Sequence, residues 1–281
     1  MTTATHSSAV NAGGAVLDFR QAGLSYGARA LWDGLDLRVR PGEFLAVLGP
    51  NGAGKTSMLR TILGQQRLTR GSLDFLGAPV RRGDRRIGYI PQQRLMEAGT
   101  PLRARDLIAL GLNGHRWGAG RLGRAGSERL EQVIEHVGAG GFADAPVAEL
   151  SGGEQQRIRV GQAIAASPAL MLCDEPLISL DLRHQRVVTD LIDAERRERA
   201  TSVVFVTHDI NPILGAVDRV LYIASGRFLI GTADEVLRSE VLSDLYGTDV
   251  DVVRTMGRIV IVGSNDPHVP GHASLGMERA P

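Results

Sequence analysis

The chain has 281 residues, of which 43% are hydrophobic and 22% are charged, and its formal net charge at pH 7 is +1. This composition predicts a folded globular protein rather than a disordered one, and the near-zero charge argues against a nucleic-acid partner. Cys173 is the single cysteine, which excludes a disulfide framework and any multi-cysteine zinc or iron–sulfur site.

No apolar run approaches the roughly 18 residues that a membrane-spanning helix needs. Residues 1–14 have neither the basic nor the apolar region of a secretion signal. We therefore expect a cytosolic protein. Residues 1–14 and 264–281 are rich in small and polar residues and are expected to be mobile tails on either side of one domain, 15–263.

Short apolar runs alternate with segments of helical periodicity along this domain, and the alternation predicts an α/β fold. The expected strands are Val16–Arg20, Leu35–Val39, Glu43–Leu48, Ser72–Phe75, Ile87–Ile90, Leu170–Cys173, Ser202–Val206, Val220–Ile223 and Arg227–Ile230. The expected helices are Lys55–Leu63, Ala104–Leu110, Glu128–Val137, Glu154–Ala166, Leu182–Arg197 and Pro212–Ala216. The stretch from about 95 to 166 has almost no strand signal, which indicates a helical insertion in the α/β core.

Residues 49–56 read GPNGAGKT, which matches the pattern G-x-x-x-x-G-K-[ST] between an apolar strand and a helical segment. Glycines at 49, 52 and 54 let backbone N–H groups face an anion, and the helix that follows adds its positive dipole end. Lys55, the single lysine among 32 basic residues, would reach the β- and γ-phosphates, and Thr56 would bind Mg²⁺. The alternative, a glycine-rich turn with an incidental lysine, does not account for the strand–loop–helix context. The predicted nucleotide-binding residues are Gly49, Pro50, Asn51, Gly52, Ala53, Gly54, Lys55, Thr56 and Ser57.

A second segment, ALMLCDEP at 169–176, is a buried-strand pattern that ends in two acids. Asp174 at the carboxyl edge of this strand would complete the Mg²⁺ shell, and Glu175 could polarise an attacking water as a general base. Acids often terminate strands, so this segment gains its meaning from the loop at 49–56.

A third segment, LSGGEQQR at 150–157, precedes a helix. Ser151 and Glu154 have capping-box spacing, and an ordinary helix cap is one interpretation. That interpretation leaves Gly152 and Gly153 unexplained, since glycine costs helix stability. A second anion site, which grips the γ-phosphate of a nucleotide bound to another copy, explains them.

Together these segments resemble the ATP-binding cassette (ABC) family over nearly the whole chain. GPNGAGKT is similar to its Walker A loop, LSGGE to its signature and LMLCDEP to its Walker B strand. Asp181 in SLD matches the D-loop and His208 in VVFVTHD the switch histidine. Gln92 in IGYIPQQR matches the Q-loop glutamine, with Gln93 beside it as the alternative, and Tyr26 in LSYG is similar to the aromatic that stacks on adenine.

The resemblance implies a P-loop ATPase fold with a mixed sheet, the helical insertion and an antiparallel β subdomain. It also implies a head-to-tail dimer in which ATP lies between the Walker A loop of one copy and the LSGGE segment of the other. In such a dimer Gln92 touches Mg²⁺ and the attacking water, and His208 contacts the γ-phosphate and holds Glu175. Asp181 crosses to the site of the partner copy.

The same resemblance implies a transport ATPase at the cytoplasmic face of the membrane. One cassette with no membrane span needs separate permease subunits, and the insertion between Gln92 and Ser151 is where this family docks them. IGYIPQQR, PLRARDLIALGL and THDINPIL resemble the zinc and manganese importers of the family, which work with an extracytoplasmic solute-binding protein. The residues themselves show no metal-recognition cluster, since His268 and His272 stand alone in the predicted tail.

Other functions within the family stay open. A non-transport cassette ATPase, such as the soluble subunit of an iron–sulfur assembly complex, fits the chain length, and so does a transporter of another solute.

DNA-repair and chromosome-structure ATPases are excluded, because they need a long coiled coil between the two anion sites and this chain has no heptads there. A duplicated translation-type cassette is also excluded, because it would need a second set of motifs and this chain has one.

Overall fold

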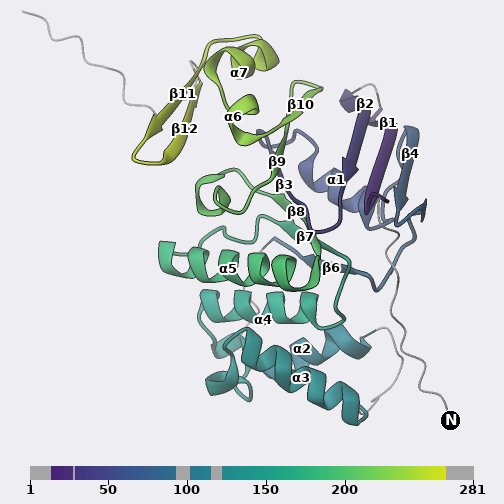
Figure 1. Ribbon diagram of the computed structural model, residues 1–281, viewed down its shortest axis with the longest axis vertical. Helices are drawn as coiled ribbons and strands as arrows, with labels where there is room; N and C mark the ends of the chain where they lie inside the picture. The colour runs from purple at the N-terminus through teal and green to yellow at the C-terminus, as the bar shows by residue number, and fades with distance from the viewer. Residues whose placement is uncertain (1–13, 28, 93–101, 115–121, 264–281) are drawn as a thin grey trace, which may run out of the picture.

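The computed structural model describes residues 14–27, 29–92, 102–114 and 122–263, and it confirms the predicted α/β fold (Figure 1). A six-stranded sheet with the order β10-β9-β3-β8-β7-β6 forms the centre of the molecule. All neighbours in this sheet are parallel except β10, which pairs antiparallel with β9. The strands are β3 (Phe44–Leu48), β6 (Ile87–Ile90), β7 (Leu170–Asp174), β8 (Ser202–Val206), β9 (Arg219–Ala224) and β10 (Arg227–Gly231).

Three of these strands, β3, β7 and β8, are buried at every position, as strands covered on both faces should be. Alternate residues of β3 enter different hydrophobic clusters, because successive side chains of a strand point to opposite faces. Phe44, Ala46 and Leu48 join the cluster on the side of the long helices. Leu45 and Val47 join the cluster beneath the second sheet. The sheet therefore separates two cores.

The second sheet is antiparallel, with the order β2-β1-β4-β5, and it confirms the expected antiparallel β subdomain. Its strands are β1 (Leu17–Tyr26), β2 (Arg29–Val39), β4 (Arg70–Phe75) and β5 (Ala78–Pro79). With α1 (Lys55–Ile62) it covers one face of the central sheet, and both contribute to the same hydrophobic cluster. β1 and β2 extend well beyond the short strands expected from the sequence.

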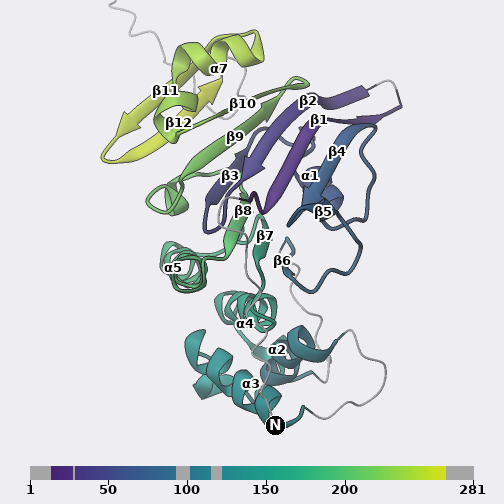
Figure 2. The same cartoon turned by 45° about the vertical axis from the view of Figure 1, so that its right-hand side comes forward.

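The expected helical insertion is present in the described residues as α2 (Ala104–Asn113), α3 (Arg124–His136) and α4 (Gly152–Ile164), with 3₁₀ turns at 140–142 and 147–149. α2 and α3 lie at one end of the molecule, and α4 and α5 (Leu182–Arg199) lie between them and the central sheet (Figures 1 and 2). The exact domain boundaries stay predictions, since 1–13, 93–101, 115–121 and 264–281 lie outside the described residues.

The region after β8 differs most from the sequence-based expectation. The helix expected at Pro212–Ala216 is wrong: only a 3₁₀ turn, Asn211–Ile213, forms there. The Asn211 side chain donates to the carbonyl of Ile259 (2.8 Å) and accepts from its N–H (2.7 Å), which ties the turn to β12. The sequence analysis also missed α6 (Ala233–Val236), α7 (Ser239–Tyr246) and the hairpin of β11 (Val250–Thr255) and β12 (Arg258–Gly263).

Candidate functional site

The loop at 49–54 connects the carboxyl end of β3 to the start of α1, as the motif predicted. Gly49 has φ 139°, and a Cβ atom there would lie 2.0 Å from the carbonyl oxygen of Ile223 in β9. Only glycine allows this close approach of the loop to the neighbouring strand. Gly54 is the N-cap of α1 and provides no side-chain cap, so the first N–H groups of the helix are available to an anion.

Lys55 is buried, with 5% of its surface exposed. Its Nζ donates to the carbonyl oxygens of Gly49 (2.6 Å) and Pro50 (3.0 Å). Burial lowers the pKa of Lys55, whereas the nearby charges of Glu175 and Asp174 act in the opposite direction. The ammonium is thus held inside the curve of the loop, where the motif predicted a phosphate contact.

Asp174 is the last residue of β7 and is only 3% exposed. The Thr56 hydroxyl donates to its Oδ1 (3.2 Å), and the Tyr89 hydroxyl donates to its Oδ2 (3.4 Å). Burial raises the pKa of Asp174, and both hydroxyl hydrogen bonds oppose that shift. A carboxylate beside a hydroxyl at the end of the phosphate loop is the hard oxygen donor set that Mg²⁺ prefers. The residues present fit this ion.

Glu175 and His208 follow two neighbouring parallel strands, β7 and β8, and the structure brings them together. The His208 Nδ1 lies 3.7 Å from the Glu175 Oε2, with the glutamate side chain 15% exposed and the imidazole 60% exposed. Glu175 has a positive φ of 47°, which is uncommon outside glycine, and its N–H donates to the carbonyl of Val206 (3.0 Å). This backbone bond holds the turn that presents the carboxylate at the strand ends.

Gln92 lies two residues beyond the end of β6. It lines a cavity of about 580 Å³ together with Thr56 and Asp174. The structure therefore places Gln92 at the predicted metal site. Gln93, the alternative, lies outside the described residues. Arg60 and Arg159 also line this cavity, and the sequence analysis did not single them out.

Tyr26 ends β1 and is 52% exposed. Its hydroxyl donates to the Gln66 Oε1 (2.8 Å) and lies 3.4 Å from the Ser57 Oγ. The aromatic ring therefore stands at the first turn of α1, beside the phosphate loop. Arg29 on β2 donates to the carbonyl of Gly52 (3.3 Å), and neither Gln66 nor Arg29 belongs to a motif that could have identified it.

The segment LSGGE begins α4, and its capping box is present. Ser151 accepts from the N–H of Glu154 (3.4 Å), while the Glu154 carboxylate accepts from the Ser151 N–H (2.9 Å). Asp181 is the N-cap of α5, and its side chain accepts from the His184 N–H (2.9 Å). In the described part of the chain, the hydrogen bonds of Ser151 and Asp181 are with their own helices. Among these described hydrogen bonds, none connects either motif to the phosphate loop of the same molecule.

Gly153 and His184 bring the starts of α4 and α5 into contact. A Cβ atom on Gly153 would lie 2.0 Å from the His184 Cδ2. The Nδ1 of the same ring lies 2.8 Å from the Asp181 Oδ2. The second glycine of LSGGE thus has a steric role within the monomer, besides any role in binding an anion.

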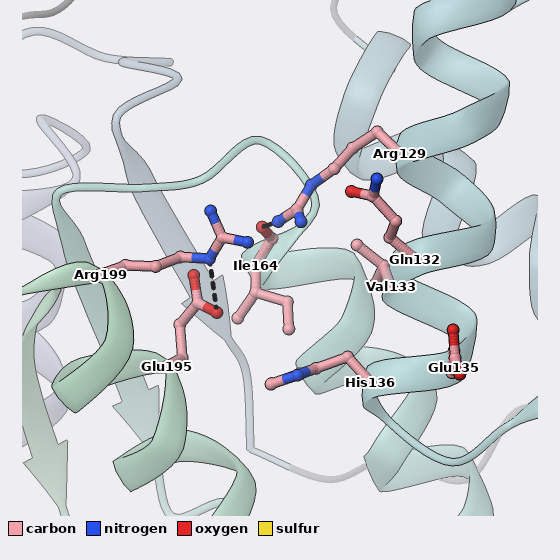
Figure 3. Close-up of a pocket in the computed structure, with 8 residues that line it drawn as sticks. All are labelled: Arg129, Gln132, Val133, Glu135, His136, Ile164, Glu195 and Arg199. Atoms are coloured by element: carbon pink, nitrogen blue, oxygen red, sulfur yellow. Dashed lines mark hydrogen bonds and ion pairs between the residues drawn. The ribbon is translucent and has the colours of Figure 1, made fainter.

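A separate cavity of about 390 Å³ lies between α3, the end of α4 and α5 (Figure 3). Arg129 donates to the carbonyls of Ile164 (3.0 Å) and Ala165 (3.1 Å), and so satisfies the last turn of α4. Glu195, 1% exposed, pairs with the Arg199 Nε (3.3 Å), and burial raises the pKa of Glu195. These charged residues form a cluster where the helical insertion faces a core helix, and none of them lines the cavity of the predicted nucleotide site.

Two expectations concern metal transport and membrane insertion. Within the described residues no group of three or more His, Cys, Asp or Glu side chains could hold a metal ion, and His268 and His272 lie outside those residues. In the same ranges, no helix has the length and apolar content to cross a membrane.

Known proteins with similar sequences include ATP-binding proteins of import and transport systems. A sequence model described as ABC transporter matches residues 32–178. The zinc import ATP-binding protein ZnuC of Paramagnetospirillum magneticum is 34% identical over 227 residues, covering 81% of this chain and 80% of the relative. The zinc transport system ATP-binding protein TroB of Treponema pallidum is 31% identical, covering 77% and 81%. The iron(3+)-hydroxamate import ATP-binding protein FhuC of Bacillus subtilis is 28% identical, covering 84% and 90%.

Solved structures agree on the fold. A metal-chelate type ABC transporter in an inward-facing conformation superimposes with a TM-score of 0.73 and 25% identity, covering 88% of this chain and 96% of that one. The ADP-bound conformation of MJ1267, an ATP-binding cassette of an ABC transporter, gives a TM-score of 0.67 at 18% identity, covering 82% and 94%.

Proposed function

The chain belongs to the ABC transporter family and hydrolyses ATP to drive transport, and on this premise we propose which of its residues perform the reaction. One observation carries the proposal: the ends of β3, β7 and β8 gather Lys55, Thr56, Asp174, Glu175 and His208. Residues 49–57 hold the phosphates of ATP through backbone N–H groups and the Lys55 ammonium. Tyr26, exposed beside this loop, stacks on the adenine.

Thr56, Asp174 and Gln92 hold Mg²⁺ at the same cavity. When bound, the ion neutralises negative charge on the phosphate oxygens. The support is chemical: a buried carboxylate, a hydroxyl and an amide are all oxygen donors, and they converge where the phosphate loop ends.

Glu175 accepts the proton of the attacking water, and His208 holds the glutamate and contacts the γ-phosphate. The 3.7 Å separation of Glu175 Oε2 and His208 Nδ1 supports this division of roles. Purified protein should release phosphate from ATP in a Mg²⁺-dependent reaction. A preparation that binds ATP and Mg²⁺ but releases no phosphate, even with its membrane partners present, would contradict the assignment.

The other half of the site comes from a second copy of the chain, packed head to tail. Ser151, Gly152, Gly153 and Glu154 present the amino end of α4 to the partner's γ-phosphate, and Asp181 reaches the partner's site. Within the described residues, Ser151 and Asp181 are hydrogen-bonded to residues of the helices that they begin, which makes the amino ends of both helices candidates for a role across an interface. Light scattering with a hydrolysis-deficient variant should show a dimer with Mg·ATP and a monomer without nucleotide.

ABC ATPases of import systems work with membrane permease subunits, and we place this chain at the cytoplasmic face of the membrane beside such subunits. The insertion formed by α2, α3 and α4 is the proposed docking region, since it projects from the ATPase core (Figure 2). An extracytoplasmic solute-binding protein is the indirect partner on the other side.

For the solute, we propose a divalent metal ion, zinc or manganese. The names of the relatives support it, since ZnuC and TroB are zinc proteins and MntB of Halalkalibacterium halodurans is a manganese protein. FhuC, at a similar identity, makes a ferric chelate the competing solute.

Uptake measurements decide between the two solutes. A deletion strain that lacks other importers should lose accumulation of radioactive zinc or manganese, and the wild-type chain should restore it, while the Glu175→Gln variant should not. Loss of ferric hydroxamate uptake with unchanged zinc and manganese would replace the metal-ion assignment. No change in any of the three would reject both.

A further inference from the structure

The hydroxyl of Tyr89 makes a contact with the nucleotide site that no motif of the chain assigns. It donates to Asp174 Oδ2 at 3.4 Å, while Thr56 donates to Oδ1 at 3.2 Å. Each oxygen of the carboxylate proposed to hold Mg²⁺ therefore has one hydroxyl donor. The plane of the carboxylate is fixed from two sides.

Strand register explains why a tyrosine reaches this carboxylate. β6 and β7 are parallel neighbours, and Tyr89 pairs with Leu172. Leu172 and Asp174 are two residues apart, so their side chains and that of Tyr89 share one face of the sheet. A rise of about 3.3 Å per residue puts Asp174 about 6.6 Å further along the strand, a span that the para-hydroxyl of a tyrosine ring covers.

Electrostatics favours this arrangement. A phenol has an ordinary pKa of about 10, so the Tyr89 hydroxyl carries its proton at neutral pH and can donate to the carboxylate. Because Thr56 is itself proposed to contact Mg²⁺, Tyr89 is the donor that is free of the metal.

We propose that Tyr89 is a positioning residue that orients the Asp174 carboxylate for the divalent cation of the nucleotide site. The inference rests on the proposed function of Asp174 as a holder of that cation. Tyr89 also lines the cavity that contains Gln92, three residues further along the chain. Strand β6 and the two residues that follow it thus supply both the residue that orients the metal carboxylate and the glutamine that would contact the metal.

The test removes only the hydroxyl, in a Tyr89→Phe variant. Mn²⁺ serves as the probe and is titrated by electron paramagnetic resonance into protein saturated with a non-hydrolysable ATP analogue. We expect the affinity for Mn²⁺ to fall about 3- to 10-fold, since the lost hydrogen bond is to a charged group that orients a metal ligand. The affinity for the analogue in the presence of EDTA should not change.

Tyr246→Phe is the matched control. This variant also deletes a phenolic hydroxyl, which lies 3.0 Å from the Tyr222 hydroxyl. Tyr246 is the last residue of α7 and does not line the cavity of the nucleotide site. Its Mn²⁺ affinity should equal that of the wild type. An unchanged Mn²⁺ affinity in Tyr89→Phe, or an equal loss of analogue binding without metal, overturns the positioning role. If the wild-type protein itself binds no Mn²⁺ with the analogue, the proposed function of the site fails instead.

Discussion

The contact between Gly153 and His184 leads to a prediction in which one substitution has opposite effects in two backgrounds. Gly153 is the second residue of α4 and is buried. An alanine there would place its Cβ 2.0 Å from the His184 Cδ2 and 2.5 Å from the Cγ. Moving the ring aside would disturb the 2.8 Å contact between its Nδ1 and the Asp181 Oδ2.

Two free-energy terms set the expected change in the free energy of unfolding. Replacing glycine by alanine inside a helix stabilises by about 0.5–1 kcal/mol. Overpacking a filled site destabilises by about 1–3 kcal/mol. In the wild-type background, Gly153→Ala should therefore lower the free energy of unfolding by up to about 2.5 kcal/mol. In a His184→Ala background the steric term vanishes, and the same substitution should raise it by about 0.5–1 kcal/mol.

Urea denaturation of the four proteins in the double-mutant cycle, without nucleotide, measures both effects. Gly161→Ala is the control on the same helix. Its Cβ would meet the side chains of Ile108 and Val133 rather than the histidine, so its effect should not depend on residue 184. Equal destabilisation by Gly153→Ala in both backgrounds would refute the steric role of His184.

Three further predictions concern charged groups. Glu175→Gln should abolish phosphate release while ATP still binds, because the amide cannot accept the water proton; wild-type phosphate release by this variant would remove Glu175 as the base. Lys55→Arg should weaken ATP binding at least about tenfold, because a planar guanidinium does not fit where Nζ contacts Gly49 and Pro50, and near-normal binding by equilibrium dialysis would contradict this. The raised pKa of Glu195 contributes stability below its ordinary value of 4.5 that is lost as pH rises through the folded-state pKa. The melting temperature of Glu195→Gln relative to that of the wild type should therefore increase as the pH rises above 4.5. A difference in melting temperature that does not change with pH would count against the burial effect.

The backbone geometry of the proposed nucleotide site was predictable because its information is local. The run at 49–56 contains its own strand exit, its turn glycines and its helix start, and the structure has each of them. Asp174 and Glu175 follow a run of apolar residues that only a strand buried on both faces explains. Parallel strands of one sheet present their carboxyl ends on the same edge, so Lys55 and these acids had to meet.

The C-terminal region was not predictable for the opposite reason. Pro212–Ala216 has helical propensity after its proline, but Asn211 is held by both backbone groups of Ile259, which is 48 residues away. The Asp209 carboxylate also accepts from the Asn211 N–H (2.9 Å), a local bond that favours a tight turn. Such tertiary contacts decide the conformation and leave no periodic signal in the segment itself.

Tyr89 and His184 were missed for a related reason. Tyr89 precedes Asp174 by 85 residues, and only the register of β6 against β7 shows that its hydroxyl meets the carboxylate. His184 looks like an ordinary residue in the first turn of α5, and its contact with Gly153 depends on how α4 and α5 pack. Motifs identify groups that touch the nucleotide, whereas residues that orient those groups emerge only from the fold.

The helices α4 and α5 show how such packing organises the site. Each carries a motif at its amino end, Ser151 on α4 and Asp181 on α5. At their carboxyl ends both helices meet the charge cluster of Figure 3, where Arg129 of α3 holds the last carbonyls of α4 and Glu195 of α5 lies buried beside it. The two motif-bearing helices contact each other at their amino ends through Gly153 and His184, while the ion pair of Glu195 with Arg199 lies within α5 itself. Because Gly153 packs against His184 and Arg129 holds the last carbonyls of α4, we expect the segments proposed to face the partner's nucleotide to move together with α3 of the helical insertion.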